Sequence, residues 1–157
     1  MIEVLSLLLD RLLQWMPSLL LKIFLKPEKL AAQVLIRLRE ERPIVLALTS
    51  EVRYLDLYLD ITNHSPLLLT LDRLLIDMWF GQPTFTGAVL RRARIRPRET
   101  SFSVFHREFL TTGQRDQIDR FLASKEAKGR LMIHLTAYLD SKIGVIEVRR
   151  DVDREAP

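Results

Sequence analysis

Several residue types that carry chemistry are missing from this chain or scattered along it. Cysteine is absent, which excludes disulfide bridges and thiolate metal sites. The five glycines are isolated from one another, so the sequence has no glycine-rich loop to hold a phosphate. The histidines His64, His106 and His134 show no metal-ligand spacing, and no serine lies in a nucleophile-elbow pattern. We therefore expect a protein that is not an enzyme and uses neither a cofactor nor a metal.

Charge of one sign and long apolar runs are also scarce. The net charge of +4 in 157 residues is too small by itself to indicate a nucleic-acid partner. The longest uncharged stretch near the N-terminus, residues 12–21, has 10 residues and contains Pro17, whereas a membrane-spanning helix needs about 20. Glu3 is the only charge before the apolar run, where a signal peptide carries basic residues. These features predict a protein of the cytoplasm, which can also lie against the inner face of the membrane.

Hydrophobic alternation with a period of two is abundant from residue 44 onward. In residues 52–62 four aliphatic side chains fall on one side, and polar or aromatic ones fall on the other, which is typical of a strand with one buried face. The aliphatic set is Leu55, Leu57, Leu59 and Ile61, and the opposite set is Tyr54, Asp56, Tyr58, Asp60 and Thr62. Similar runs predict strands at residues 44–49, 52–62, 67–80 (interrupted near Asp72), 83–90, 100–110, 130–140 and 143–151.

Seven short strands separated by turns predict a mainly β fold: an immunoglobulin-like antiparallel β-sandwich over residues 44–151. One inserted helix is expected between Thr112, a suitable N-cap, and Gly129, just past the helix end. Residues 152–157 form a polar tail. Asp56 and Asp60 are about 13 Å apart along their strand, which is too far for an acid–base pair, so they indicate a solvated face.

Residues 1–43 show a helical period and form a Leu-rich amphipathic segment. Pro17 should break this helix, because it removes a backbone donor. Pro27 favours a fresh helix start, and that second helix should continue to Arg42, since Pro43 disfavours helical geometry in the residue before it. The polar stripe of the first helix is narrow and consists of Glu3, Ser6, Asp10, Gln14, Ser18, Lys22 and Lys26.

Several features of the strand block occur together in a known family. A long first strand ends in an Asn-containing turn at residues 63–66, and the next strand runs to a turn at Gly81. A strand of hydroxyl and aromatic residues spans 100–110, and residues 138–147 join the last two strands. In these features residues 44–151 resemble the late-embryogenesis-abundant type 2 family, or water-stress-hypersensitive (WHy) domain. The resemblance implies a sandwich without catalysis, associated with stress protection, and lipid contact in membrane-attached members. The chain departs from the family at Ser65-Pro66, where Asn-Pro is more usual, and in its Leu-rich N-terminal helices.

The apolar surface of the N-terminal helices exceeds what packing on one sandwich requires. Three lysines, Lys22, Lys26 and Lys29, lie where an interfacial helix places cations against anionic headgroups. This surface has three alternative destinations: a membrane surface, a homo-oligomer or partner contact through residues 2–25, or a cap on the sandwich. The residues expected to contact a membrane or a partner are Trp15, Met16, Leu19, Leu20, Lys22, Ile23, Phe24 and Lys26.

A basic run at residues 91–98 is the second candidate surface. In an extended backbone its arginines share one face, while Ala93, Ile95 and Pro97 share the other. Such a face can be solvated and discourage edge-to-edge aggregation, or it can bind phosphates of lipid headgroups. A nucleic-acid partner is not favoured, because stacking aromatics are not interleaved. The candidate headgroup contacts are Arg92, Arg94, Arg96 and Arg98.

Together these features predict a non-enzymatic, stress-associated protein that attaches peripherally to a membrane surface through its N-terminal helices. The sequence leaves two alternatives open. The sandwich could bind or transport a lipid between its sheets, or the N-terminal helices could assemble a structural oligomer.

Overall fold

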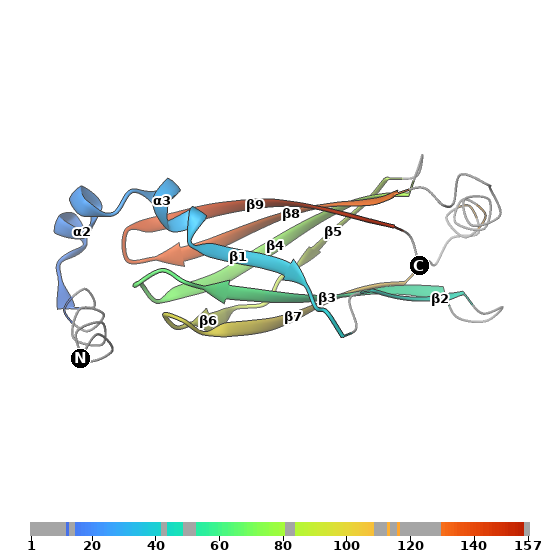
Figure 1. The fold of residues 1–157 in the computed structure, drawn as a ribbon, viewed down its shortest axis with the longest axis horizontal. Coiled ribbons are helices and arrows are strands. Elements are labelled where there is room, and N and C mark those ends of the chain that lie inside the picture. The colour runs from blue at the N-terminus through green and yellow to red at the C-terminus, as the bar shows by residue number, and fades with distance from the viewer. Residues whose placement is uncertain are drawn as a thin grey trace.

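The computed structural model describes residues 12, 15–41, 44–48, 53–80, 84–108, 113, 116 and 130–155. Two short helices precede nine strands in this described part (Figure 1). The helices are α2 (Ser18–Phe24) and α3 (Pro27–Ala32). The strands are β1 (Val34–Leu38), β2 (Ile44–Leu48), β3 (Arg53–Asn63), β4 (Leu69–Phe80), β5 (Thr84–Val89), β6 (Ala93–Ile95), β7 (Thr100–Glu108), β8 (Arg130–Ser141) and β9 (Gly144–Glu155).

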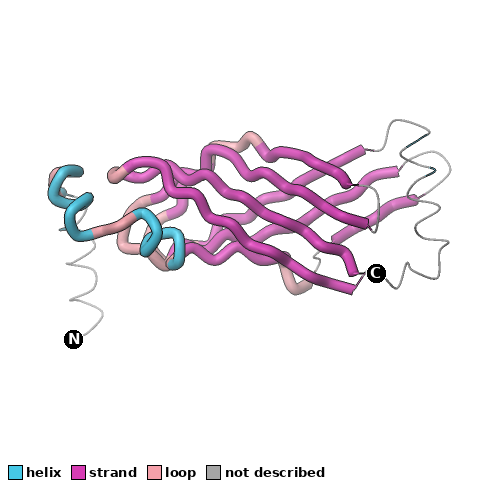
Figure 2. The backbone as a smooth tube through the Cα atoms, turned by 90° about the horizontal axis from the view of Figure 1, so that it is seen from above, coloured by secondary structure: helices cyan, strands magenta, loops and turns pink. Residues whose placement is uncertain are grey.

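The strands form two antiparallel sheets that pack face to face. In the first sheet β1, β2 and β7 all pair with β3. In the second sheet the order is β5-β4-β8-β9, and β6 pairs with the start of β4. The strands run along the long axis of the molecule, and both helices lie at one end of them (Figure 2). The predicted mainly β sandwich is therefore confirmed, with strand bounds close to those expected. The exception is β9, which runs to Glu155, because residues 152–155, expected in a polar tail, continue its pairing with β8.

The core lies between the two sheets and is made by the alternation that the sequence shows. Leu55, Leu57, Leu59 and Ile61 of β3 are each 0% exposed, because their period of two turns them all toward the second sheet. The interruption expected near Asp72 is a register shift between Leu71 and Arg73 in the pairing of β4 with β8. The second sheet contributes these residues to the same hydrophobic core: Leu69, Leu74, Ile76, Met78, Ile133, Leu135, Ala137, Leu139, Ile146 and Val148.

The prediction of one helix from Pro27 to Arg42 is wrong beyond Ala32. Pro27 does begin α3, but the helix ends at Ala32 and β1 follows it. Val34, Ile36 and Leu38 are buried and the residues between them are exposed, which is a strand pattern. The same residues also fit helical spacing. Pairing with β3 favours the strand, because it satisfies the backbone hydrogen-bonding groups of both β1 and β3. β6 is likewise a strand that was not expected, and the helix expected after Thr112 lies outside the described residues except for Gly113 and Asp116.

β1 and β2 form one interrupted edge of the first sheet. β1 pairs with residues 59–63 of β3, and β2 pairs with residues 53–57, on the same side of that strand. Between them Arg39 donates its backbone N–H to the carbonyl of Tyr58 at 2.9 Å, and pairing resumes at Ile44. An edge that is broken in this way is a poor template for pairing with another chain.

Asn63, at the end of β3, ties the two sheets together. Its side chain is fully buried and donates hydrogen bonds to the carbonyls of Leu67 at 2.8 Å and Ile95 at 3.0 Å. Its Oδ1 accepts bonds from the backbone N–H of Ser65 at 2.9 Å and from the Ser65 hydroxyl at 2.6 Å. The side chain thus uses both donor protons and its acceptor, and it joins β3 of one sheet to β6 of the other.

Gly87 brings the two sheets into close contact at β5. A Cβ at this position would lie 2.3 Å from ring atoms of Phe105, which projects from β7 in the opposite sheet. Glycine is therefore required here by the closeness of the ring, since any larger residue would meet Phe105.

Replacing Asn63 should destabilise the sandwich strongly. We expect Asn63→Ala to lower the free energy of unfolding by about 3 kcal/mol, because it leaves several buried polar groups without partners. Asn63→Asp should also destabilise, since a carboxylate cannot donate to the two carbonyls. Urea unfolding measures both, with His64→Ala in the same turn as the control because its side chain is exposed. An Asn63→Ala variant as stable as the control would contradict the stabilising role of the Asn63 hydrogen bonds.

Gly87→Ala should cost about 2 kcal/mol of stability, because the new methyl group overlaps the Phe105 ring. The double variant Gly87→Ala/Phe105→Leu removes the ring and should lose less than the sum of the two single variants. Thermal or urea unfolding of the four proteins in the cycle checks this. Additive losses would show that the two residues do not meet.

Candidate functional site

α2 is positioned by two proline residues and by one buried leucine. Pro17 precedes the first residue of α2, so the helix breaks there as predicted. Leu21 is the one buried residue of this helix, is 0% exposed and belongs to the hydrophobic core. Pro27 then starts α3, whose Leu30 is buried in the same core. Two short helices are thus anchored by one leucine each, and the described part of the chain has no helix that is both long and apolar enough to span a membrane.

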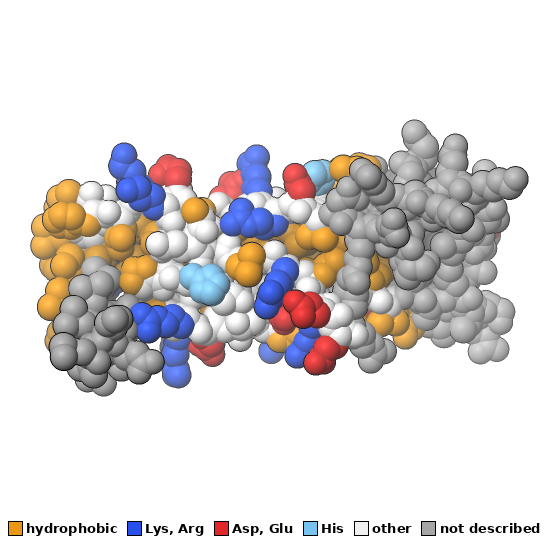
Figure 3. Space-filling view, in the orientation of Figure 1, with side chains coloured by type: hydrophobic (Ala, Val, Ile, Leu, Met, Phe, Trp, Pro, Cys, Tyr) orange, Lys and Arg blue, Asp and Glu red, His pale blue; other side chains and the backbone are white. Residues whose placement is uncertain are grey.

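Large apolar side chains of this segment remain uncovered at the end of the molecule. Trp15 is 88% exposed, Leu19 is 74% exposed, and Phe24 is 70% exposed. We call the surface formed by Trp15, Leu19, Leu20, Ile23 and Phe24 the apolar tip. Figure 3 shows the hydrophobic side chains gathered at the α2 end of the elongated molecule. An exposed patch of this kind is uncommon on a soluble monomer and marks an interaction site.

The apolar tip is fixed to the sandwich by contacts on its inner side. Met16 and Leu25 are partly buried against the core, and Lys142, in the turn between β8 and β9, donates from Nζ to the carbonyl of Met16 at 3.2 Å. Of the three destinations expected for this segment, a cap on the sandwich accounts for Leu21 and the partly buried residues. It leaves the five residues of the apolar tip unexplained.

Exposed cations lie on α2 and in the residues that follow it. Lys22, which lies on α2, and Lys26 and Lys29, which follow it, are all exposed. Basic side chains lie beside the hydrophobic end of the molecule (Figure 3). An apolar centre with a basic rim is the arrangement of an interfacial anchor.

The basic run at residues 91–98 reaches the same end of the molecule. Its central part is β6, in which Ile95 is buried and Arg94 is exposed, so the predicted alternation is confirmed there. Arg96 and Arg98 are also exposed, but Arg98 has a positive φ of 64° and lies in the turn to β7. Arg92 differs from these three because it forms an ion pair with Asp72, at 3.6 Å between Nε and Oδ1.

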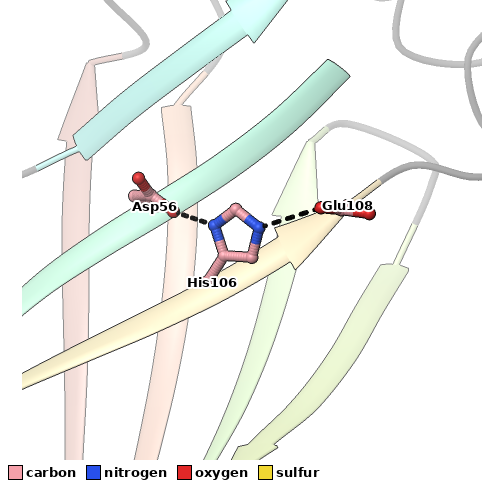
Figure 4. A network of polar contacts seen from close by, with 3 residues as sticks. All are labelled: Asp56, His106 and Glu108. Atoms are coloured by element: carbon pink, nitrogen blue, oxygen red, sulfur yellow. Dashed lines mark hydrogen bonds and ion pairs between the residues drawn. The ribbon is translucent and has the colours of Figure 1, made fainter. Parts of the chain in front are cut away.

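The outer face of the first sheet carries a polar cluster that the sequence analysis missed. His106 of β7 lies opposite Asp56 of β3, and its Nδ1 is 2.5 Å from Asp56 Oδ1 (Figure 4). Its Nε2 is 3.5 Å from Glu108 Oε1. Both ring nitrogens therefore face carboxylates. The hydrogen bond to Asp56 raises the pKa of His106 above 6.5, burial acts in the opposite direction, and the Glu108 bond adds to the rise.

A second histidine repeats this arrangement on the outer face of the other sheet. His134 of β8 is hydrogen-bonded through Nδ1 to Asp151 of β9, and the Trp79 ring meets it edge-on at 4.4 Å between centroids. His134 is half-exposed, as expected from its place opposite the buried Ile133 and Leu135. Within the described ranges no group of three His, Asp or Glu side chains is arranged to hold a metal ion. Both pairs cross-link neighbouring strands.

Comparisons with known proteins support the fold. No protein-family model and no curated protein matches the sequence. The structural genomics target SoR45 superposes with a TM-score of 0.54 at 10% identity, over 80% of this chain and 88% of that one, which shows a shared fold. Two further structures have lower TM-scores. A protein of Bordetella pertussis provisionally named ApaA has a TM-score of 0.47 at 13% identity, over 79% of this chain and 90% of that one. The solution structure of a protein provisionally assigned to the late-embryogenesis-abundant proteins has a TM-score of 0.45 at 8% identity, over 79% of this chain and 71% of that one.

Asp56→Asn should move the pKa of His106 back toward 6.5, because it removes the charge that stabilises the protonated imidazole. Since the folded pKa is raised, the pair stabilises the fold at pH values below 6.5. That contribution is lost as the pH rises through the folded pKa. An NMR titration of His106 measures the shift, and Asp60→Asn, on the same face of β3, is the matched control. An unchanged His106 pKa in Asp56→Asn would contradict the pairing.

Proposed function

We propose that this chain is a non-enzymatic protein that attaches peripherally to a membrane surface through its apolar tip. The observation that carries the proposal is the exposure of five large apolar side chains on and beside a helix whose inner side is anchored in the core. Burial of Leu21 fixes α2 to the sandwich, so insertion of the tip into lipid would attach the whole body. The association with stress protection rests only on the resemblance of residues 44–151 to the late-embryogenesis-abundant type 2 family.

The chemistry of the tip favours lipid over a second protein surface. Trp15 and Phe24 are bulky, and tryptophan is enriched at the level of lipid headgroups. Lys22 and Lys26 flank the tip, and each cation near an anionic leaflet contributes on the order of 1 kcal/mol. A lysine rim is less suited to a protein interface, where lysine is depleted. Attachment at the bilayer surface would therefore combine apolar burial with charge attraction.

Replacing two apolar residues of the apolar tip with glutamine should weaken attachment strongly. We expect Ile23→Gln/Phe24→Gln to weaken binding to vesicles of phosphatidylcholine and phosphatidylserine by about 3 kcal/mol, or on the order of 100-fold, because both side chains would leave water on insertion. Co-sedimentation with the vesicles measures the partition. The matched control is Leu90→Gln/Met132→Gln, which changes two exposed apolar residues outside α2.

The same proteins distinguish the rival destinations of the tip. Light scattering without lipid should show a monomer for the unaltered chain. A dimer that Ile23→Gln/Phe24→Gln converts to a monomer, with no binding to vesicles, would show that a second copy covers the tip and would overturn the proposal. Equal partition of the tip variant and the control would also overturn it.

A further inference from the structure

The turn between β6 and β7 is held in place by several hydrogen bonds. Arg98 donates its backbone N–H to the carbonyl of Asn63 at 2.6 Å, and Asn63 donates its own N–H to the carbonyl of Glu99 at 3.0 Å. The carboxylate of Glu99 accepts the backbone N–H of Arg96 at 2.8 Å, so this acid is used in holding the turn. The exposed arginines next to it therefore project from a fixed backbone.

Three arginines of this region differ from Arg92 in their ion pairing among the described residues. Arg94, Arg96 and Arg98 are all exposed. Among the residues that the structure describes, no carboxylate forms an ion pair with any of them, whereas Arg92 is paired with Asp72. We call Arg94, Arg96 and Arg98 the arginine edge.

The register of the second sheet brings the arginine edge to the end that carries the apolar tip. Thr70 of β4 pairs with Arg94 on one side and with Asp140 of β8 on the other. Two residues beyond Asp140, Lys142 contacts the carbonyl of Met16 at the base of the tip. The β6–β7 and β8–β9 connections both lie at the α2 end of the molecule (Figure 1). The apolar tip and the arginine edge therefore lie at the same end of the molecule.

We propose that the arginine edge binds the phosphates of anionic lipid headgroups while the apolar tip enters the bilayer, an inference that rests on the proposed function. Guanidinium groups bind phosphate oxygens in pairs of parallel hydrogen bonds, which ammonium groups cannot do. Arg94 and Arg96 are about 7 Å apart along an extended backbone, so neighbouring side chains can take separate phosphates. Contacts of the apolar tip and of the arginine edge hold the sandwich so that its long axis points out of the membrane plane. They also make attachment selective for anionic lipid.

The test compares vesicles of phosphatidylcholine alone with vesicles that also contain phosphatidylserine. For the unaltered protein, co-sedimentation should increase strongly with phosphatidylserine and decrease as salt is added. Arg94→Gln/Arg96→Gln/Arg98→Gln should lose on the order of 100-fold in binding to the anionic vesicles, about five-fold for each arginine, and little in binding to neutral ones. Arg37→Gln/Arg107→Gln/Arg149→Gln removes the same charge from other strands and should lose much less. If the triple variant does not fold, Arg94→Gln and Arg96→Gln serve singly.

The outcomes separate this inference from the proposed function. Failure of the unaltered protein to bind any vesicle overturns both. Binding that is equal for the two lipid compositions, or equal in the arginine-edge variant and the matched control, overturns the inference and leaves attachment by the apolar tip standing. Calorimetric binding of inorganic pyrophosphate without vesicles, lost in the variant, would assign the arginine edge to a soluble phosphate instead. Binding of an RNA oligonucleotide that is lost in the variant would assign it to nucleic acid.

Discussion

The hydrogen bonds of Asn63 hold together the end of the sandwich on which the candidate surfaces lie. The side chain is fully buried and joins β3 to the segment after it and to β6. Its main chain fixes the β6–β7 turn, and the next residue, His64, donates its backbone N–H to the carbonyl of Gln33 at the end of α3. Asn63 and His64 together thus connect both sheets, the turn that carries part of the arginine edge, and the helix that follows the apolar tip. Since a buried amide is favourable only when its partners are in place, the whole arrangement forms together.

The short helices depend on that arrangement. A helix of seven residues such as α2 is not stable alone in water, because nucleation costs more than so few hydrogen bonds return. Burial of Leu21 and Leu30, and the contact of Lys142 with Met16, hold the segment against the sandwich. The side that faces away keeps its apolar residues exposed, which costs free energy in water and would be relieved by lipid. One side of α2 therefore packs on the sandwich, and the opposite side makes the proposed contact with the membrane.

Much of this fold could be predicted from the sequence, and particular residues show why the rest could not. The alternation of Leu55 to Ile61 predicts β3 and its buried face, and Pro17 and Pro27 mark helix limits correctly. Val34 and Leu38 fit both a helix and a strand, so β1 is decided by an open edge of β3 that the local pattern does not reveal. The pairing of Asp56 with His106 depends on the register of strands that are 50 residues apart. The shared position of the tip and the arginine edge likewise follows from topology alone.

The chain contains two tryptophans, and they allow the central claim to be tested directly. Trp15 belongs to the apolar tip, while Trp79 lies near the far end of β4, beside His134. In Trp79→Phe the fluorescence of Trp15 alone should shift to the blue on addition of anionic vesicles and should be quenched by brominated lipid chains. In Trp15→Phe, the fluorescence of Trp79 should show neither change. An unshifted, unquenched Trp15 in protein that sediments with the vesicles would contradict insertion of the tip.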